Sequence, residues 1–144
     1  MTDGAVPAEL VRRITDDPWA RSLGVEYLDV RPGYCRAALR LAPHMVNHLG
    51  SPHGSVVFAL ADAAFGVACN SHGAPAVALN VTIGFLAAAR PGSRLTAECR
   101  ERRQGRQAGF YEVTVTDDDG TLIAVLHCIA HRLARGGRRP STAR

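Results

Sequence analysis

The stretch from residue 55 to residue 71 constrains the fold of this chain more than any other feature of its sequence. It is rich in alanine, has no proline inside it and places apolar residues on every side of a helical projection, so it predicts one long helix. A helix that is apolar on all sides must be buried. The other strong elements of the 144-residue chain are typical of β-strands, so a sheet must supply the cover.

Strand patterns lie on both sides of this helix. Residues 25–30 and 34–41 predict a hairpin, because an Arg-Pro-Gly turn signal separates them. The patterns that follow the helix cover residues 76–87, 94–103, 109–116 and 121–133. Short connectors, one of them an Asp-Gly turn, favour antiparallel pairing. The sequence therefore predicts an α+β fold in which an antiparallel sheet of five or six strands wraps around one long buried helix.

The length of the chain fits one domain, and no internal repeat is present. We expect an N-terminal helical segment over residues 1–20, the main domain over residues 21–133 and a basic tail over residues 134–144. The 17 Lys and Arg residues are all Arg, and five of them lie in the last 13 residues, which contain no acidic residue. This tail accounts for most of the formal charge of +4. Because no aromatic residues are interleaved there, we expect a solvated tail and no nucleic-acid partner.

Several other classes of protein are excluded by composition and motifs. No apolar run reaches the roughly 18–20 residues of a membrane span, and the N-terminus lacks the pattern of a signal peptide. The four cysteines form no Cys-x-x-Cys pair, which is typical of a reducing compartment, so we expect a soluble, cytoplasmic protein without a membrane partner. We expect no metal either, because two histidine pairs with helical spacing lack further ligands: His44/His48 and His127/His131.

Asp62 is the first candidate for chemistry. It lies near the middle of the predicted helix, and no Lys or Arg occurs between residues 54 and 71. A buried carboxylate is costly unless it is paired or partly hydrated. One interpretation is a structural ion pair with an Arg from a strand. The other is a functional carboxylate, because the small residues Ala59, Ala63 and Gly66 leave room beside it.

The start of the same helix supplies a second candidate, the dipeptide His53-Gly54. Free N–H groups and the positive end of the helix dipole meet there, which suits a developing oxyanion. Ordinary helix capping is the alternative interpretation. A third candidate, Asn47, lies in the preceding loop, where its amide could orient a water or a carbonyl or could form an Asx turn.

Helix geometry separates these candidates within one chain. His53 and Asp62 differ by nine steps of about 100°, so they face opposite sides of the helix, and eight residues from Gly54 to Asp62 span about 12 Å. One small reaction centre therefore needs these residues from two different subunits. Two antiparallel helices across a two-fold axis would bring each N-terminus near the middle of the partner, which predicts an isologous dimer with two equivalent sites.

These candidates form part of a longer pattern that extends along the chain. It comprises His44-Met45-Val46-Asn47, His53-Gly54, residues 58–65 around Leu60-Ala61-Asp62, residues 68–71, residues 104–107 and residues 111–113. Over about residues 18–133 this pattern resembles the hotdog-fold thioesterases, specifically the PaaI-like group of the phenylacetic acid degradation type. The combination is far more specific than any single motif in it.

The resemblance implies a hotdog fold, an edge-to-edge dimer, often a dimer of dimers, and hydrolysis of acyl-CoA thioesters at a site shared between subunits. It implies that Asp62 is the catalytic carboxylate, acting as base on water or as nucleophile. Gly54 would give its backbone N–H to the thioester carbonyl with support from His53, and Asn47 would help to orient the water or carbonyl. No cofactor is implied, because CoA is part of the substrate. We expect an aryl or arylacetyl acyl group, such as phenylacetyl or hydroxyphenylacetyl.

Contacts to CoA are expected at Arg103, Arg106 and Asn80. The Arg forks suit phosphate groups, although a solvated strand face explains them equally. The chain also departs from the family pattern, since Ser55 stands where a second glycine is usual and Gly84 stands where an Asp is common. The rival hypotheses are a hotdog enoyl-CoA hydratase, a non-catalytic acyl-CoA-binding module and a purely structural oligomer.

Overall fold

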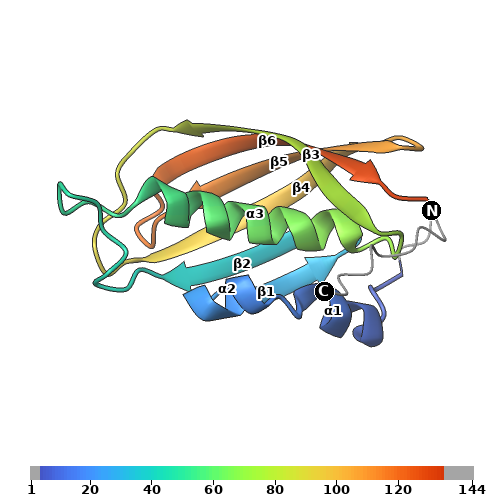
Figure 1. Cartoon of the computed structure of the whole chain (residues 1–144), viewed down its shortest axis with the longest axis horizontal. Helices are drawn as coiled ribbons and strands as arrows, with labels where there is room; N and C mark the ends of the chain where they lie inside the picture. Colours follow the sequence, from blue (N-terminus) through green and yellow to red (C-terminus); the bar gives the residue numbers. More distant parts are fainter. Residues whose placement is uncertain (1–3, 135–144) are drawn as a thin grey trace, which may run out of the picture.

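The computed structural model describes residues 4–134, and its main feature is one helix lying along one face of a single sheet (Figure 1). All six strands are antiparallel to their neighbours, in the order β1-β2-β4-β5-β6-β3. The helices are α1 (Ala8–Thr15), α2 (Pro18–Leu23) and α3 (Gly54–Asn70). The strands are β1 (Glu26–Arg31), β2 (Tyr34–Arg40), β3 (Ala76–Phe85), β4 (Arg94–Gln104), β5 (Ala108–Thr116) and β6 (Leu122–Arg132).

The predicted elements are confirmed, with boundaries that differ by one or two residues. The predicted hairpin is formed by β1 and β2, and the Asp-Gly turn joins β5 to β6. The strand order contains one step that the connectors do not reveal. β3 pairs with β6, at the opposite side of the sheet from β2, although β4 follows β3 in sequence. The sheet therefore ends in two edge strands, β1 and β3.

The N-terminal segment is fixed by helix caps. The Oδ1 atom of Asp17 accepts hydrogen bonds from the backbone N–H groups of Trp19 and Ala20, at 2.9 and 3.1 Å, and Pro18 is the first residue of α2. Gly24 ends α2 in the left-handed conformation with a φ of 83°. The boundary expected between residues 20 and 21 thus falls inside α2. Of the expected basic tail, residues 135–144 lie outside the described residues.

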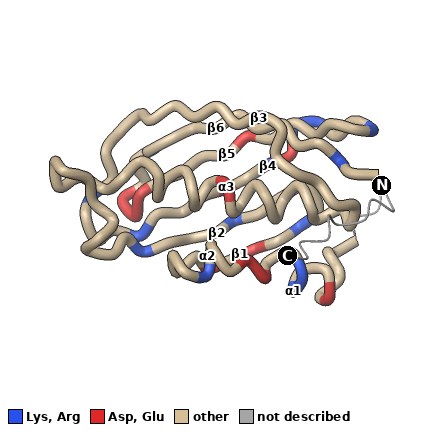
Figure 2. Tube along the Cα trace, in the orientation of Figure 1, with Lys and Arg blue, Asp and Glu red and all other residues tan. Residues whose placement is uncertain are grey.

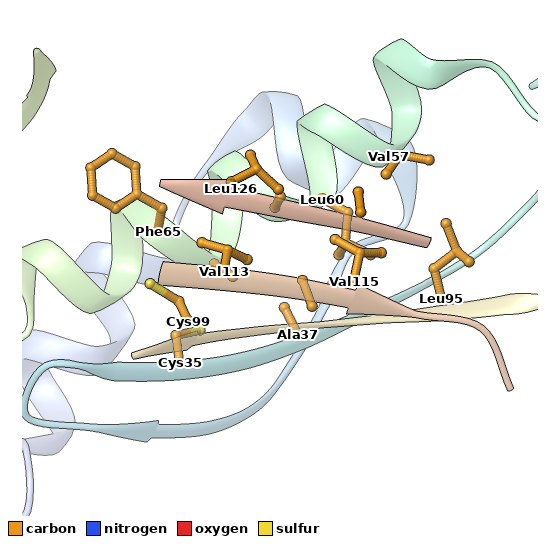
Figure 3. Packing of buried hydrophobic residues seen from close by; sticks show 14 of the residues in the cluster. Cys35, Ala37, Val57, Leu60, Phe65, Leu95, Cys99, Val113, Val115 and Leu126 are labelled. Carbon is orange, nitrogen blue, oxygen red and sulfur yellow. The ribbon is translucent and has the colours of Figure 1, made fainter. Parts of the chain in front are cut away.

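The core lies between α3 and the sheet. Leu60 and Phe65 on α3 belong to one buried cluster with Val113 on β5 and Leu126 on β6 (Figure 3). Phe65 also packs edge-on against Tyr111, with 5.4 Å between the ring centroids. Burying side chains of this size contributes about 1.5–3 kcal/mol each. This packing fixes the rotation of α3 about its axis and thereby determines which residues point away from the sheet.

The predicted sheet wrapped around one long helix is confirmed, and within the single chain it covers one face of that helix. Ser55 and Asp62 are exposed. Ala59, which lies between them, and Gly66, which follows Asp62, are only half-buried. These four residues form one stripe on the side of α3 opposite the core. Two of the four residues in this stripe are polar, and the other two, Ala59 and Gly66, are so small that they add little area that needs cover. The sheet therefore covers one face of α3 and leaves the Asp62 face open.

Charged side chains are distributed unevenly over this framework. Basic segments follow β2 and β4, whereas the only charged segment on α3 is acidic (Figure 2). Arg36 and Arg40 of β2 are exposed. Within residues 4–134, no helix has both the length and the apolar character that crossing a membrane requires.

Candidate active site

Asp62 lies on the wall of a cavity of about 400 Å³. The cavity is bounded by α3, by the α1–α2 segment, by Tyr27 of β1 and by the start of β3. Asp16, Asp17 and Trp19 contribute to its wall, but no Arg or His among the described residues does. The structure therefore provides no Arg partner for Asp62 in this cavity, and the expectation of a carboxylate inside a fully buried helix is replaced by a carboxylate at the mouth of a cavity.

The surroundings of Asp62 favour its protonated form. Desolvation by the cavity walls raises the pKa of Asp62, and the negative charge of Asp17 raises it further. Burial likewise raises the pKa of Tyr27 to about 12, so its hydroxyl remains a hydrogen-bond donor at neutral pH. A carboxylate with a raised pKa is a stronger base than an ordinary one, which suits it to taking a proton from water.

Gly54 is the first residue of α3 and lines a second cavity, of about 360 Å³. Its backbone N–H has no acceptor among the described residues, as expected for the first turn of a helix. A side chain at this position would be crowded, because a Cβ atom would lie 3.2 Å from Cζ of Phe85. Glycine therefore keeps the free N–H accessible beside the Phe85 ring.

His53 caps α3 through its ring. The Nδ1 atom accepts a hydrogen bond from the backbone N–H of Ser55 at 3.1 Å, and the Ser55 Oγ atom lies 2.7 Å from the same nitrogen. The capping interpretation of His53 is thus confirmed for Nδ1. The Nε2 atom has no partner among the described residues and remains free to face a ligand.

Asn47 forms the Asx turn that the sequence left open as one interpretation. Its Oδ1 atom accepts hydrogen bonds from the N–H groups of Leu49 and Ser51, at 2.9 and 3.2 Å. The side-chain N–H₂ group makes no hydrogen bond within residues 4–134 and is the part of the amide that can still contact a ligand. The loop is drawn toward α3 because the His53 N–H donates to the Met45 carbonyl at 2.8 Å. Asn47, His53 and Gly54 therefore belong to one loop–helix junction.

Gly54 and Asp62 line different cavities, and the two linings share no residue. The single chain thus keeps apart the two groups that one reaction centre would need, as the helix geometry predicts.

The residues expected to contact CoA lie elsewhere on the surface. Arg103, Arg106 and Asn80 are exposed, and none of them lines either cavity. Arg103 follows an irregularity in the pairing of β4 with β5, and Arg106 lies in the turn between those strands. Asn80 follows a similar irregularity in β3, and its Oδ1 atom accepts a hydrogen bond from Thr82 at 3.3 Å. In the part of the chain that the structure describes, no carboxylate pairs with Arg103 or Arg106.

Sequence reasoning missed the residues that the α1–α2 segment brings to the Asp62 cavity: Asp16, Asp17 and Trp19. The Asp-Pro dipeptide was a usable signal, because Asp before Pro is typical of a helix N-cap and so marks the start of α2. The side of the domain on which α2 lies could not be inferred from that signal. Among residues 4–134, no three His, Cys, Asp or Glu side chains are grouped as metal ligands would be.

Comparisons with known proteins identify the family of this chain. The family model described as "Thioesterase superfamily" matches residues 49–124. Acyl-coenzyme A thioesterase PaaI of Escherichia coli K12 is 35% identical over 118 residues, which are 82% of this chain and 84% of that protein. The solved structure of the E. coli PaaI protein from the phenylacetic acid degradation operon superposes with a TM-score of 0.83 and 31% identity, covering 88% of this chain and 96% of the other. A variant of the phenylacetic acid degradation protein PaaI of Thermus thermophilus gives a TM-score of 0.78 with 32% identity, over 81% of this chain and 100% of that one.

Proposed function

This chain belongs to the thioesterase superfamily and is a PaaI-like acyl-CoA thioesterase of hotdog fold, and from that premise we propose that it hydrolyses aryl- or arylacetyl-CoA thioesters to free acid and CoA. Asp62 is proposed as the general base. It takes a proton from water, whose oxygen attacks the thioester carbonyl carbon. The C–S bond then breaks and CoA leaves as the thiol once it has regained a proton. The raised pKa of Asp62 supports this role, because it makes the ionised carboxylate a better proton acceptor.

The oxyanion that forms in this reaction is assigned to the start of α3. The free N–H of Gly54 and the positive end of the helix dipole stabilise negative charge on the former carbonyl oxygen. The Nε2 atom of His53 and the side-chain N–H₂ of Asn47 lie at the same junction, as donors that orient the carbonyl or the water. No step needs a metal or an organic cofactor, since CoA belongs to the substrate.

The single observation that carries the proposed substrate class is the aromatic lining beside Asp62. Trp19 and Tyr27 contribute to that cavity, and Trp19 is 67% exposed in the single chain. An aromatic acyl group can stack against such rings, and aromatic pairs contribute about 0.5–1.5 kcal/mol beyond the burial of area.

The proposed substrate class is tested by measuring CoA release from a panel: phenylacetyl-, hydroxyphenylacetyl-, benzoyl-, short-chain and long-chain acyl-CoA. We expect the highest kcat/KM for the aryl and arylacetyl members. Trp19→Ala should lower kcat/KM for phenylacetyl-CoA by about three- to tenfold and leave that for a short-chain thioester nearly unchanged. Trp19→Phe keeps an aromatic ring and is the matched control.

A preference of the wild-type protein for straight-chain thioesters would contradict the aryl assignment and leave the thioesterase class intact. Binding of all panel members without release of CoA would instead favour an acyl-CoA-binding module.

The neighbouring Asp17 should set part of the pH dependence. Removing its negative charge makes Asp62 easier to ionise, so the pKa of Asp62 falls and the acid limb of kcat/KM moves to lower pH. Asp17→Asn is a suitable change because asparagine caps a helix as well as aspartate does. We expect this shift in pH–rate profiles with the best substrate of the panel.

Asp16→Asn is the matched control, because Asp16 lines the same cavity but forms an ion pair with Arg21. Its acid limb should coincide with that of the wild-type protein. An acid limb that stays in place in Asp17→Asn would contradict the proposed electrostatic coupling.

We further propose that the active unit is a homodimer joined through β3. This ten-residue strand is an edge of the sheet, and β6 pairs with it on one side only. Its apolar side chains Val77, Leu79 and Phe85 are 48%, 67% and 55% exposed. A long, apolar, unpaired edge is a template for pairing with another chain, and a second copy related by a two-fold axis would supply an identical edge.

Pairing of two β3 strands would also complete the site. Phe85 at the end of β3 lies at the Gly54 cavity, whereas Ala76 and Ala78 at its start line the Asp62 cavity. Two antiparallel copies place the end of one strand beside the start of the other. The Gly54 cavity of one chain would then adjoin the Asp62 cavity of its partner.

Arg103 and Arg106 remain proposed contacts for the phosphates of CoA. Both guanidinium groups are exposed and lack a carboxylate partner in the part of the chain that the structure describes. Their lack of a partner supports the proposal, because a guanidinium that is not already paired can offer its full fork to a phosphate. Asn80 is proposed as a further polar contact on β3.

A further inference from the structure

Ser55 is the second residue of α3, and its side chain points back to the helix cap. Its backbone N–H donates to Nδ1 of His53 at 3.1 Å, and its Oγ atom lies 2.7 Å from the same nitrogen. One residue thus offers two donors to one ring atom. Both residues are exposed in the single chain.

These two contacts determine which ring nitrogen carries the proton. A backbone N–H can only donate, so Nδ1 of His53 must accept, and the proton of the neutral imidazole then lies on Nε2. The hydroxyl of Ser55 donates to the same lone pair and restrains the rotation of the ring. The imidazole is held with an N–H donor at its outer end, at the same helix N-terminus as the free N–H of Gly54.

We propose that Ser55 is a positioning residue, which holds His53 with Nε2–H as a fixed donor so that this group and the Gly54 N–H together stabilise the oxyanion of the thioester. The inference rests on the proposed function, because it assumes that the start of α3 binds the reacting carbonyl. A donor that is already oriented before the reaction stabilises transition-state charge more than one that must be ordered during it.

A direct chemical role for Ser55 is less consistent with the same contacts. A serine nucleophile needs a base that takes its proton. The only base within hydrogen-bond distance of the Ser55 hydroxyl among the described residues is Nδ1 of His53, whose single lone pair is shared between the Ser55 hydroxyl and the Ser55 N–H and is therefore a weak proton acceptor. The hydroxyl therefore serves to orient the ring.

The proposal is tested by comparing Ser55→Ala, Ser55→Thr and wild type with two readouts. The first is the ¹⁵N resonance of Nδ1 of His53 in the intact dimer. The second is the separate measurement of kcat and KM with the best thioester of the panel. In Ser55→Ala we expect the Nδ1 resonance to shift, because one of its two hydrogen-bond donors is lost while the backbone N–H of residue 55 still donates to it. We also expect kcat to fall about three- to tenfold with little change in KM, the effect of losing one neutral hydrogen bond that acts in the transition state.

Ser55→Thr keeps the hydroxyl and should restore both readouts. Ser51→Ala is the matched control, because the Ser51 hydroxyl makes no hydrogen bond within residues 4–134. An unchanged Nδ1 resonance in Ser55→Ala would overturn the proposal, and so would a changed resonance with unchanged kcat. Wild-type protein that releases no CoA would overturn the proposed function instead, whatever the resonance shows.

Discussion

Replacing Asp62 by asparagine should lower kcat for acyl-CoA hydrolysis by about 100-fold or more, because general acid–base groups typically contribute factors of 10² to 10⁴. The amide has nearly the same shape as the carboxylate but cannot take a proton from water. The cavity around it, including Trp19 and Tyr27, should keep its form. CoA release with the best substrate of the panel measures the loss directly.

The same variant should not lose stability. The pKa of Asp62 is raised in the folded chain, so the folded state binds a proton more tightly at this carboxyl than the unfolded state does. This tighter binding stabilises the fold fully at a pH below the ordinary pKa of an aspartate. The stabilisation is lost as the pH rises through the raised pKa. At neutral pH the ionised carboxylate therefore opposes folding slightly, and a neutral asparagine does not. Thermal unfolding at pH 7 should give a Tm for Asp62→Asn equal to or above that of the wild type.

A matched control is available at the turn between β5 and β6. Oδ1 of Asp119 accepts a hydrogen bond from the N–H of Thr121 at 3.0 Å, which an asparagine can also accept, and this turn contributes to neither cavity wall. Asp119→Asn should keep wild-type kcat. Turnover by Asp62→Asn at the wild-type rate would show that the general base lies elsewhere.

The elements of the fold could be predicted from the sequence because each depends on local signals. The alanine-rich, proline-free composition of α3, the Gly24 cap and the Asp-Gly turn act over a few residues. The pairing of β3 with β6 could not be predicted, since it depends on contacts between strands far apart in the chain. Short connectors indicate antiparallel neighbours but do not say on which side of the sheet a strand returns.

The candidate site was likewise predictable from the sequence only in part. The separation of Gly54 from Asp62 follows from the period of a rigid helix, so the prediction that they face different surroundings is confirmed. The role of Asp17 near Asp62 was not predicted, because it depends on how α2 packs against α3. The exposure of Asp62 was mispredicted, since Ala59 and Gly66 count as apolar in a pattern but need little cover.

Two complementary variants test whether the reaction centre is shared between subunits. Asp62→Asn removes the proposed base, and Gly54→Pro removes the proposed oxyanion donor, because proline has no N–H. Proline is well tolerated at the first position of a helix, and His53 before it already has the extended conformation that proline requires, with φ −70° and ψ 131°. Removing one such donor costs a factor of about 10² to 10³ in kcat. Gly54→Ala places a Cβ atom against Phe85 in the same way but keeps the N–H, and it is the matched control for crowding.

Homodimers of Asp62→Asn and of Gly54→Pro should each be nearly inactive. The heterodimer of the two variants can be purified from co-expressed, differently tagged chains. It should regain about half of the wild-type kcat, because one of its two equivalent sites contains an intact Gly54 and an intact Asp62. If both residues acted within one chain, this heterodimer would contain no intact site and would stay inactive. The reciprocal heterodimer, a wild-type chain with a chain carrying both changes, gives the opposite outcome. A shared site leaves it inactive, since each of its sites then contains one altered residue, whereas a site within one chain leaves it about half active.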